Sequence, residues 1–175
     1  MCGNIGVVPT VAELAHREAI REVLASHSRG LDRNEAGLLK SAYWPEAEVD
    51  YGSFRGSAHQ FADLVGPALA GAYELTQHLL GQVFIVLEAD RATAETYVYA
   101  RHLLQGAEEE LAFAGRYLDR LELRNGCWKI IHRQVVMDWS LRLDVQDERS
   151  GDAFGALAKG AGNRRDPAYA LLPIY

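Results

Sequence analysis

The sequence has few cysteines and no long apolar run. Of its 175 residues only Cys2 and Cys127 are cysteines, so neither a disulfide framework nor a thiolate metal site is available, and we expect a reducing compartment. The first ten residues lack a basic segment followed by an apolar one, and the longest strongly apolar run covers only residues 83–87. These absences predict no export signal, anchor or membrane span, and therefore a cytoplasmic protein.

The sequence also lacks an excess of positive charge and the short motifs of common cofactor sites. Its 18 basic residues are scattered among 24 acidic ones and the net charge is −6, which argues against nucleic acid or an anionic membrane as a partner. It contains no His-x-His or His-Glu-x-x-His spacing, no GxGxxG or Walker pattern and no nucleophile elbow. We therefore expect no metal, no nucleotide cofactor and no covalent acyl mechanism.

The length and the hydrophobic content of 49% fit one domain with one sizeable core. We assign residues 11–143 to this domain and residues 1–10 to a loose N-terminus. Residues 144–175 form a C-terminal tail, because the hydrophobic periodicity gives way there to Gly, Ala and Arg.

Helical patterns come first along the chain. Apolar residues recur on one face over residues 11–29, which predicts an amphipathic helix that frays at Gly30. Asp32 then resembles the N-cap of a short second helix, which runs through Tyr43 and stops at Pro45.

Strand patterns dominate the second half. A short strand is expected at residues 48–51 and a third helix at 57–69, after which the apolar period changes from helical to alternating. The pair Asn125-Gly126 is typical of a tight hairpin. Helices followed by an antiparallel sheet indicate an α+β fold. The four long strands are expected at residues 77–88, 93–105, 111–123 and 127–141.

His78 and Asp32 are where we expect chemistry. His78 begins an apolar, β-branched run typical of a buried strand, and Asp32 lies where the first helix ends. A carboxylate bonded to one ring nitrogen fixes the tautomer of a histidine, and an imidazole with a pKa of about 6.5 is a ready base near neutral pH. The two residues have a purely structural alternative, as an N-cap and a hydrogen-bonded core histidine.

Short motifs follow one another in a characteristic order over residues 12–141. They are Gly30-Leu31-Asp32, Trp44 with Ala47, a strand with Tyr51, Phe54-Arg55-Gly56, the His78 strand, Tyr117-Leu118-Asp119 and Asn125-Gly126-Cys127-Trp128-Lys129-Ile130. This order resembles the SnoaL-like branch of the nuclear transport factor 2-like superfamily. The resemblance implies a cone-shaped α+β barrel, in which helices pack on a strongly curved antiparallel sheet around an apolar pocket.

The same branch includes cofactor-free lyases with an Asp–His dyad, among them scytalone dehydratase, bile-acid 7α-dehydratase and hexachlorocyclohexane dehydrochlorinase. The resemblance implies that Asp32 and His78 are this catalytic dyad. Tyr51 resembles a pocket tyrosine of two of the dehydratases and is the third catalytic candidate. His27 stands where the bile-acid enzyme has a tyrosine, and Met137 lies near the position of its last-strand arginine.

Other side chains are candidates for substrate binding or assembly. His27 lies on the apolar stripe of the first helix and either lines the pocket or bonds within the core. His102 faces the pocket only if its strand has the matching register; we name both histidines as substrate-binding candidates. Aromatic residues of the sheet, Tyr117 among them, favour packing or subunit contact. We expect a homo-oligomer, a dimer or trimer, with contact candidates Tyr97, Tyr99 and Trp139.

These observations together predict a cofactor-independent lyase that carries out a dehydratase-type elimination on a hydrophobic cyclic small molecule. A double-bond isomerase or a polyketide-type cyclase would use the same base and is the first alternative. A non-catalytic small-molecule-binding or protein-interaction module is the second, since a fold does not fix a function. A hydrogen bond between His78 and Asp32 inside a closed apolar cavity would favour the enzyme.

Overall fold

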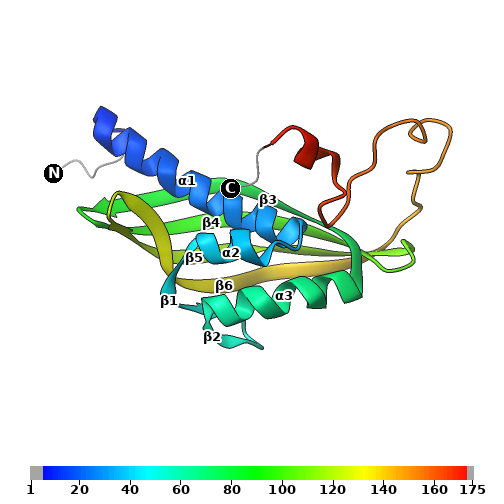
Figure 1. The fold of residues 1–175 in the computed structure, drawn as a ribbon, viewed down its shortest axis with the longest axis horizontal. Coiled ribbons are helices and arrows are strands. Elements are labelled where there is room, and N and C mark those ends of the chain that lie inside the picture. The colour runs from blue at the N-terminus through cyan, green and yellow to red at the C-terminus, as the bar shows by residue number, and fades with distance from the viewer. Residues whose placement is uncertain (1–5, 173–175) are drawn as a thin grey trace.

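The computed structural model describes residues 6–172 (Figure 1). Cys2, the first five residues of the expected loose N-terminus and the last three of the expected tail lie outside this range. No helix among the described residues is long and apolar enough to cross a membrane. The elements are α1 (Val11–Asp32), α2 (Ala36–Ser41), β1 (Tyr43–Asp50), β2 (Arg55–Ser57), α3 (Ala58–Ala72), β3 (Tyr73–Glu88), β4 (Arg91–Leu104), β5 (Glu109–Arg124), β6 (Cys127–Asp144) and the 3₁₀ helix η1 (Pro167–Ala170).

The strands form one six-stranded sheet in the order β2-β1-β6-β5-β4-β3, and helices α1, α2 and α3 cover one face of it (Figure 1). The predicted α+β architecture is confirmed, and β3 to β6 are the four predicted long strands, joined as antiparallel neighbours. The sheet is mostly antiparallel, as predicted, but β1 lies parallel to β6. These strands are far apart in the chain, so local patterns give no information about their pairing.

The turn between β5 and β6 is the predicted Asn-Gly hairpin. Asn125 and Gly126 have φ angles of 53° and 79°. Positive φ at both central residues is what a type I′ turn requires, and Asn and Gly tolerate it best. The turn starts the pairing of β5 with β6, and a register shift between Arg120 and Leu121 then places Asp119 opposite Arg133.

Helix α1 extends beyond the predicted end at Gly30. A Cβ atom on Gly30 would lie 2.8 Å from Cγ of Leu39, so the glycine allows α2 to pack closely against α1 rather than fraying the helix. Asp32 is consequently the last residue of α1. Its predicted role as the N-cap of the second helix is wrong, because Glu35 occupies that position.

Helix α2 ends at Ser41, so the prediction that it runs through Tyr43 and stops at Pro45 is also wrong. Both residues belong to β1, in which Tyr43, Ala47 and Val49 are buried. The pairing of β1 with β6 is irregular between Tyr43 and Glu48. Pro45, which has no backbone N–H, falls within that irregular stretch and is therefore compatible with a strand.

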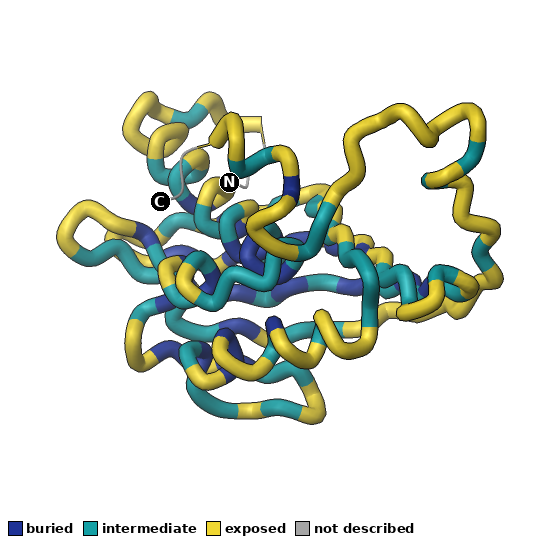
Figure 2. The backbone as a smooth tube through the Cα atoms, turned by 45° about the vertical axis from the view of Figure 1, so that its right-hand side comes forward, coloured by how far each residue is buried: buried dark blue, intermediate teal, exposed yellow. Residues whose placement is uncertain are grey.

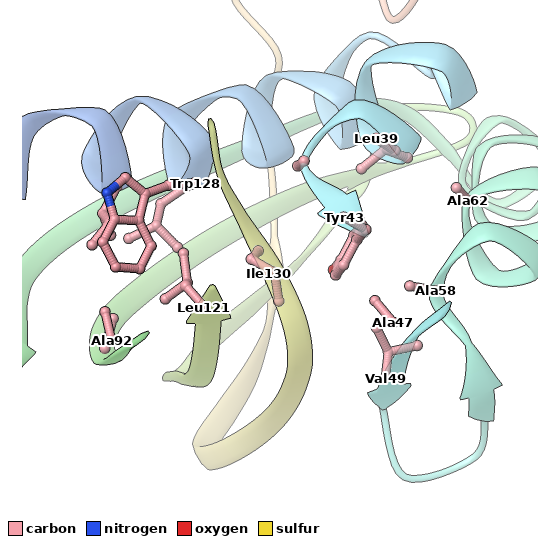
Figure 3. Close-up of a cluster of buried hydrophobic side chains, with 14 of the residues drawn as sticks. Leu39, Tyr43, Ala47, Val49, Ala58, Ala62, Ala92, Leu121, Trp128 and Ile130 are labelled. Carbon is pink, nitrogen blue, oxygen red and sulfur yellow. The ribbon is translucent and has the colours of Figure 1, made fainter. Parts of the chain in front are cut away.

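The core lies between the helices and the sheet (Figure 3). The stripe of α1 contributes Ile20 and Leu24, and the sheet contributes Leu121, Trp128 and Ile130. A smaller cluster of Val98, Ala100 and Tyr117 lies on β4 and β5. Two members of this second cluster also line the cavity described below.

Residues 145–172 leave the sheet as a largely irregular and exposed segment (Figure 2). This segment contacts the junction of α1 and α2. The side-chain amide of Asn34 donates to the Gly162 carbonyl at 2.7 Å, and Arg33 pairs with Asp166 at 3.4 Å. The tail is therefore anchored next to Asp32.

Candidate functional site

Asp32 and His78 form the predicted hydrogen bond. The distance between Nδ1 of His78 and Oδ1 of Asp32 is 2.7 Å, and the two side chains are only 7% and 12% exposed. The backbone N–H of His78 donates to Oδ2 of Asp32 at 3.0 Å, and the Thr76 hydroxyl donates to Oδ1 at 2.9 Å. Three donors thus hold this carboxylate in one orientation.

The position of β3 at the edge of the sheet explains this arrangement. An edge strand has backbone groups without a strand partner on one side, and such groups need another acceptor. The carboxylate at the end of α1 takes the amide of His78, and the same carboxylate then reaches the imidazole of that residue. The hydrogen bonds between Asp32 and His78 therefore join the end of α1 to the edge strand β3.

The partners of His78 determine its tautomer. An ionised carboxylate only accepts hydrogen bonds, so Nδ1 of His78 carries a proton and donates it to Asp32. The other ring nitrogen, Nε2, has a free lone pair whenever the imidazole is neutral. An imidazole in this state can accept a proton at Nε2 while Asp32 stabilises the resulting charge.

His78 lies in the wall of an apolar cavity of about 240 Å³. Elements α1, α3 and β3 to β6 contribute to it, together with Tyr51, which directly follows β1, as expected for a pocket between helices and a sheet. Its polar side chains are Tyr51, His78, His102 and Tyr117. The candidates Tyr51 and His102 thus both border the cavity, and Tyr117 borders it as well as packing in the sheet. The apolar lining residues are Leu31, Phe61, Val65, Leu69, Ala100, Leu111, Phe113 and Val135.

A larger and more polar depression of about 580 Å³ lies between the edge of β3 and the C-terminal tail. Asp32 and His78 also border it, together with charged residues such as Arg101, Glu110 and Arg149. Arg101 forms an ion pair with Glu110, and Arg149 forms one with Glu74. These pairs leave little unpartnered charge that could recognise a ligand. The smaller apolar cavity is the better candidate site for a hydrophobic molecule.

His102 supplies a second imidazole to the cavity. Its Nδ1 lies 3.1 Å from the Leu111 carbonyl, which can only accept, so this ring also carries its proton on Nδ1. The rings of His78 and His102 meet edge to face with centroids 5.5 Å apart. Burial, and then the proximity of His78, lower the pKa of His102, so this ring is neutral at pH 7.

A buried ion pair lies behind the cavity wall. Arg133 on β6 donates from Nε and Nη2 to the two carboxylate oxygens of Asp119 on β5, both at 2.7 Å, and both side chains are fully buried. The guanidinium also lies 4.0 Å from the ring centroid of Tyr117. Such a pair must be complete, because either charge alone would be costly to bury.

The ion pair is connected to the cavity through His27. Nη1 of Arg133 lies 2.8 Å from Nδ1 of His27, and Nε2 of His27 lies 3.3 Å from the Tyr51 hydroxyl. His27 is fully buried and does not itself line the cavity, so of its two predicted alternatives the structure shows hydrogen bonding within the core. Burial, reinforced by the charge of Arg133, holds the pKa of His27 well below 6.5.

Arg133 was not among the candidates identified from the sequence. The last-strand position considered there was Met137, which is 62% exposed and does not line the cavity. The sequence does place an acidic residue, Asp119, and a basic one, Arg133, on neighbouring strands. Their pairing could not be predicted, because it depends on the register shift between Arg120 and Leu121. Within residues 6–172, no group of three or more His, Cys, Asp or Glu side chains is arranged to hold a metal ion.

We predict that the protein loses stability on mild acidification. Below about pH 6.5 the unfolded chain takes up protons at His27 and His102, whereas the folded chain does not because their pKa values are lowered. The free energy of unfolding should then fall by about 1.4 kcal/mol per pH unit for each such histidine. Urea denaturation at pH 7.5, 6.5 and 5.5 measures this slope. A flat profile, or one that His27→Gln leaves unchanged, would contradict it.

Comparison with known proteins places these features in a family. The family model of the SnoaL-like domain matches residues 12–134. A hexachlorocyclohexane dehydrochlorinase of Sphingobium indicum is 25% identical over 130 residues, covering 72% of this chain and 84% of that protein. An uncharacterized protein of Mycobacterium tuberculosis is 23% identical over 127 residues, covering 71% of this chain and 86% of that protein.

Solved structures show the same fold. A crystal structure of hexachlorocyclohexane dehydrochlorinase LinA type 2 matches with a TM-score of 0.69 and 25% identity, covering 75% of this chain and 90% of that one. A scytalone dehydratase-like protein of Novosphingobium aromaticivorans matches with a TM-score of 0.68 and 20% identity, covering 77% and 91%. The chain therefore belongs to the SnoaL-like domain family, has the cone-shaped nuclear transport factor 2-like fold and is distantly related to a dehydrochlorinase, a lyase.

Proposed function

We propose that this protein is a cofactor-independent lyase that carries out a dehydratase-type elimination on a small hydrophobic cyclic molecule. The observation that carries the proposal is the 2.7 Å bond between His78 and Asp32 in the wall of an apolar cavity. A histidine oriented by a carboxylate and bordering an apolar pocket is equipped to remove a proton from carbon. The distant relationship to a dehydrochlorinase supports the same reaction class.

His78 is the proposed base and Asp32 its positioning partner. Nε2 of His78 takes the proton from a carbon of the bound molecule, and the electrons of that C–H bond form the new double bond. The C–O bond on the neighbouring carbon breaks, its electrons leave with the oxygen, and the His78 imidazolium returns the proton to that oxygen, so that water departs and the base is regenerated. Asp32 stabilises the imidazolium through Nδ1. Tyr51 and His102 border the same cavity and are the proposed contacts to the polar groups of the substrate.

The size and lining of the cavity restrict the substrate. A volume of about 240 Å³ is smaller than the roughly 300–1,000 Å³ typical of sites for drug-sized ligands. The proposed substrate is therefore a compact molecule with one or two rings. Eight of the twelve lining residues are apolar, so most of its surface should be hydrocarbon.

An isomerase is the second candidate, and the edge-to-face contact of His78 with His102 favours it. Each ring has its Nδ1 proton tied to an acceptor, so each offers a free Nε2 to the same cavity. Two neighbouring bases can remove a proton from one carbon and return it at another. Product analysis by mass spectrometry distinguishes the two reactions, since elimination of water lowers the mass and isomerisation does not.

We predict that turnover does not depend on a metal. The proposed base is an imidazole and the proposed step is a proton abstraction, which requires no Lewis acid. The test is to follow the consumption of a panel of one- and two-ring hydroxy ketones by mass spectrometry, before and after exhaustive dialysis against EDTA. Activity should be unchanged. Loss of activity in EDTA and its recovery on adding zinc would reject the metal-free mechanism.

We also predict a homo-oligomer formed through the outer face of the sheet. Tyr99 pairs with Ala114 and Ala114 with Trp139, so the three residues lie on one face, and Tyr97 lies two residues along the same strand. The side chains of Tyr97, Tyr99 and Trp139 are 46%, 41% and 58% exposed in the single chain. Light scattering at micromolar concentration should give at least twice the chain mass. A value equal to one chain would contradict the prediction.

A further inference from the structure

A buried chain of hydrogen bonds ends at the hydroxyl of Tyr51. It begins at Asp119, whose two carboxylate oxygens hold Nε and Nη2 of Arg133. The remaining Nη1 bonds Nδ1 of His27, and Nε2 of His27 bonds the Tyr51 hydroxyl. Asp119, Arg133 and His27 are each at most 3% exposed, so water does not compete for these bonds.

The chemistry of these groups determines which atom donates and which accepts in each of these hydrogen bonds. A guanidinium has only donors, so Nδ1 of His27 must accept, and the proton of the neutral ring is on Nε2. Nε2 of His27 therefore donates to the Tyr51 oxygen. The reverse bond, with Tyr51 donating to Nε2, would leave both ring nitrogens without a proton, which requires an imidazolate.

Tyr51 consequently keeps its own proton for another acceptor. Its ring stacks on Phe61 with centroids 4.1 Å apart, and the residue borders the same cavity as His78. Both oxygens of Asp119 are already bonded to Arg133. The neighbouring Tyr43 hydroxyl is enclosed in the core and does not line the cavity, so an acceptor on a bound molecule approaches the Tyr51 hydroxyl from the cavity.

The same ion pair leaves the cavity without a free positive charge. Arg133 does not line the cavity, and its positive charge is neutralised by Asp119 through two hydrogen bonds of 2.7 Å. The lining contains no lysine or arginine. A departing halide ion would need a cation or several donors, whereas a carbonyl or hydroxyl oxygen needs only one well-placed donor.

Building on the proposed function, we propose that Asp119, Arg133 and His27 present the Tyr51 hydroxyl as a hydrogen-bond donor, so that the substrate has an oxygen acceptor at this end rather than a halide. His27 is a positioning residue in this arrangement, and Tyr51 touches the substrate. The substrate class is then a compact cyclic ketone or hydroxy ketone. Its carbonyl oxygen lies at Tyr51 and an acidic C–H lies at His78.

The tautomer of His27 can be tested without any ligand. Nitrogen-15 NMR of the full chain should show His27 with a protonated Nε2 and an unprotonated Nδ1 across the pH range in which the protein is folded. A proton on Nδ1, or a doubly protonated ring at neutral pH, would overturn the proposal. Arg133→Met, if it folds, should allow the tautomer to change.

The acceptor preference can be tested with two probes of similar size. Cyclohexanone and chlorocyclohexane are titrated into the full chain and followed by NMR shifts of cavity residues. The wild type should bind cyclohexanone more tightly than chlorocyclohexane. Tyr51→Phe should lose about three- to tenfold in affinity for cyclohexanone, while its affinity for chlorocyclohexane stays the same. Equal binding of the two probes by the wild type, or an unchanged ketone affinity in Tyr51→Phe, would overturn the proposal.

Variants of His27 separate positioning from simple packing. A glutamine has both an acceptor and a donor, so His27→Gln should retain part of the ketone preference, whereas His27→Phe should lose it with the fold intact by circular dichroism. Thr96→Val is the matched control, because it removes a buried hydroxyl that makes no hydrogen bond among the described residues and does not line the cavity. These titrations require no turnover. Absence of lyase activity would thus reject the proposed function, and the ketone preference would still be decided by binding alone.

Discussion

His78→Ala is expected to reduce kcat/KM by a factor of about 10²–10⁴, because it removes the proposed general base from the cavity. Asp32→Asn should lose a substantial part of the same factor. An amide cannot stabilise the imidazolium as a carboxylate does, and it can also favour the wrong tautomer. Since both residues act on one proton, the double variant should be little worse than His78→Ala alone.

The matched control is His132→Ala, which removes an imidazole from β6 that does not line the cavity. It should retain wild-type turnover. Circular dichroism must show that each variant is folded, because Asp32 also bonds Thr76 and the backbone of His78. A folded His78→Ala variant with near-native turnover would contradict the base mechanism and favour the binding-module reading.

Arg133→Met is expected to destabilise the protein by about 3–5 kcal/mol, the typical result of breaking a buried ion pair. Asp119 would remain fully buried without its partner, and His27 would lose the donor to its Nδ1. Asp119→Asn should be destabilising for the same reason, since it leaves the guanidinium uncompensated. Urea denaturation at pH 7.5 measures both effects.

The control is a surface ion-pair cluster on β4, β5 and β6. Arg116 bonds Asp138 and Glu95, and these side chains are roughly a third exposed. Arg116→Met should therefore cost at most about 1 kcal/mol. The double variant Arg133→Met with Asp119→Leu should be more stable than either single change, because no charge remains buried. If Arg133→Met and Arg116→Met lowered the free energy of unfolding by equally small amounts, the assignment of Arg133 and Asp119 as a buried ion pair would be contradicted.

Local patterns predicted the elements that are defined by local physics. The apolar stripe of α1, the four long strands and the Asn125-Gly126 hairpin depend on side-chain period and backbone preference over a few residues. The limits of α1 and α2 were wrong because they depend on tertiary contacts. Gly30 is retained within a helix by its close approach to Leu39, and Pro45 is tolerated where β1 pairs irregularly with β6.

The candidate site divides in the same way. Asp32, His78 and Tyr51 were found because each lies in a motif of the family, and the hydrogen bond between the first two is present. Arg133 was missed, since nothing in the local sequence distinguishes an inward-facing arginine from a solvated one. Only the register between β5 and β6 places it against Asp119 and directs its third donor to His27. The contacts of Arg33 and Asn34 with the tail likewise join residues more than a hundred positions apart.

The most direct test of the His78–Asp32 base is deuterium exchange into a bound ketone. Cyclohexanone in D₂O with EDTA is incubated with the wild type and with His78→Ala, and deuterium next to the carbonyl is measured by mass spectrometry. The wild type should accelerate exchange at these carbons, because Nε2 of His78 removes a proton there, and His78→Ala should exchange no faster than buffer. If NMR shows the ketone in the cavity and exchange is still no faster than buffer, or is equally fast in His78→Ala, then His78 is not the base.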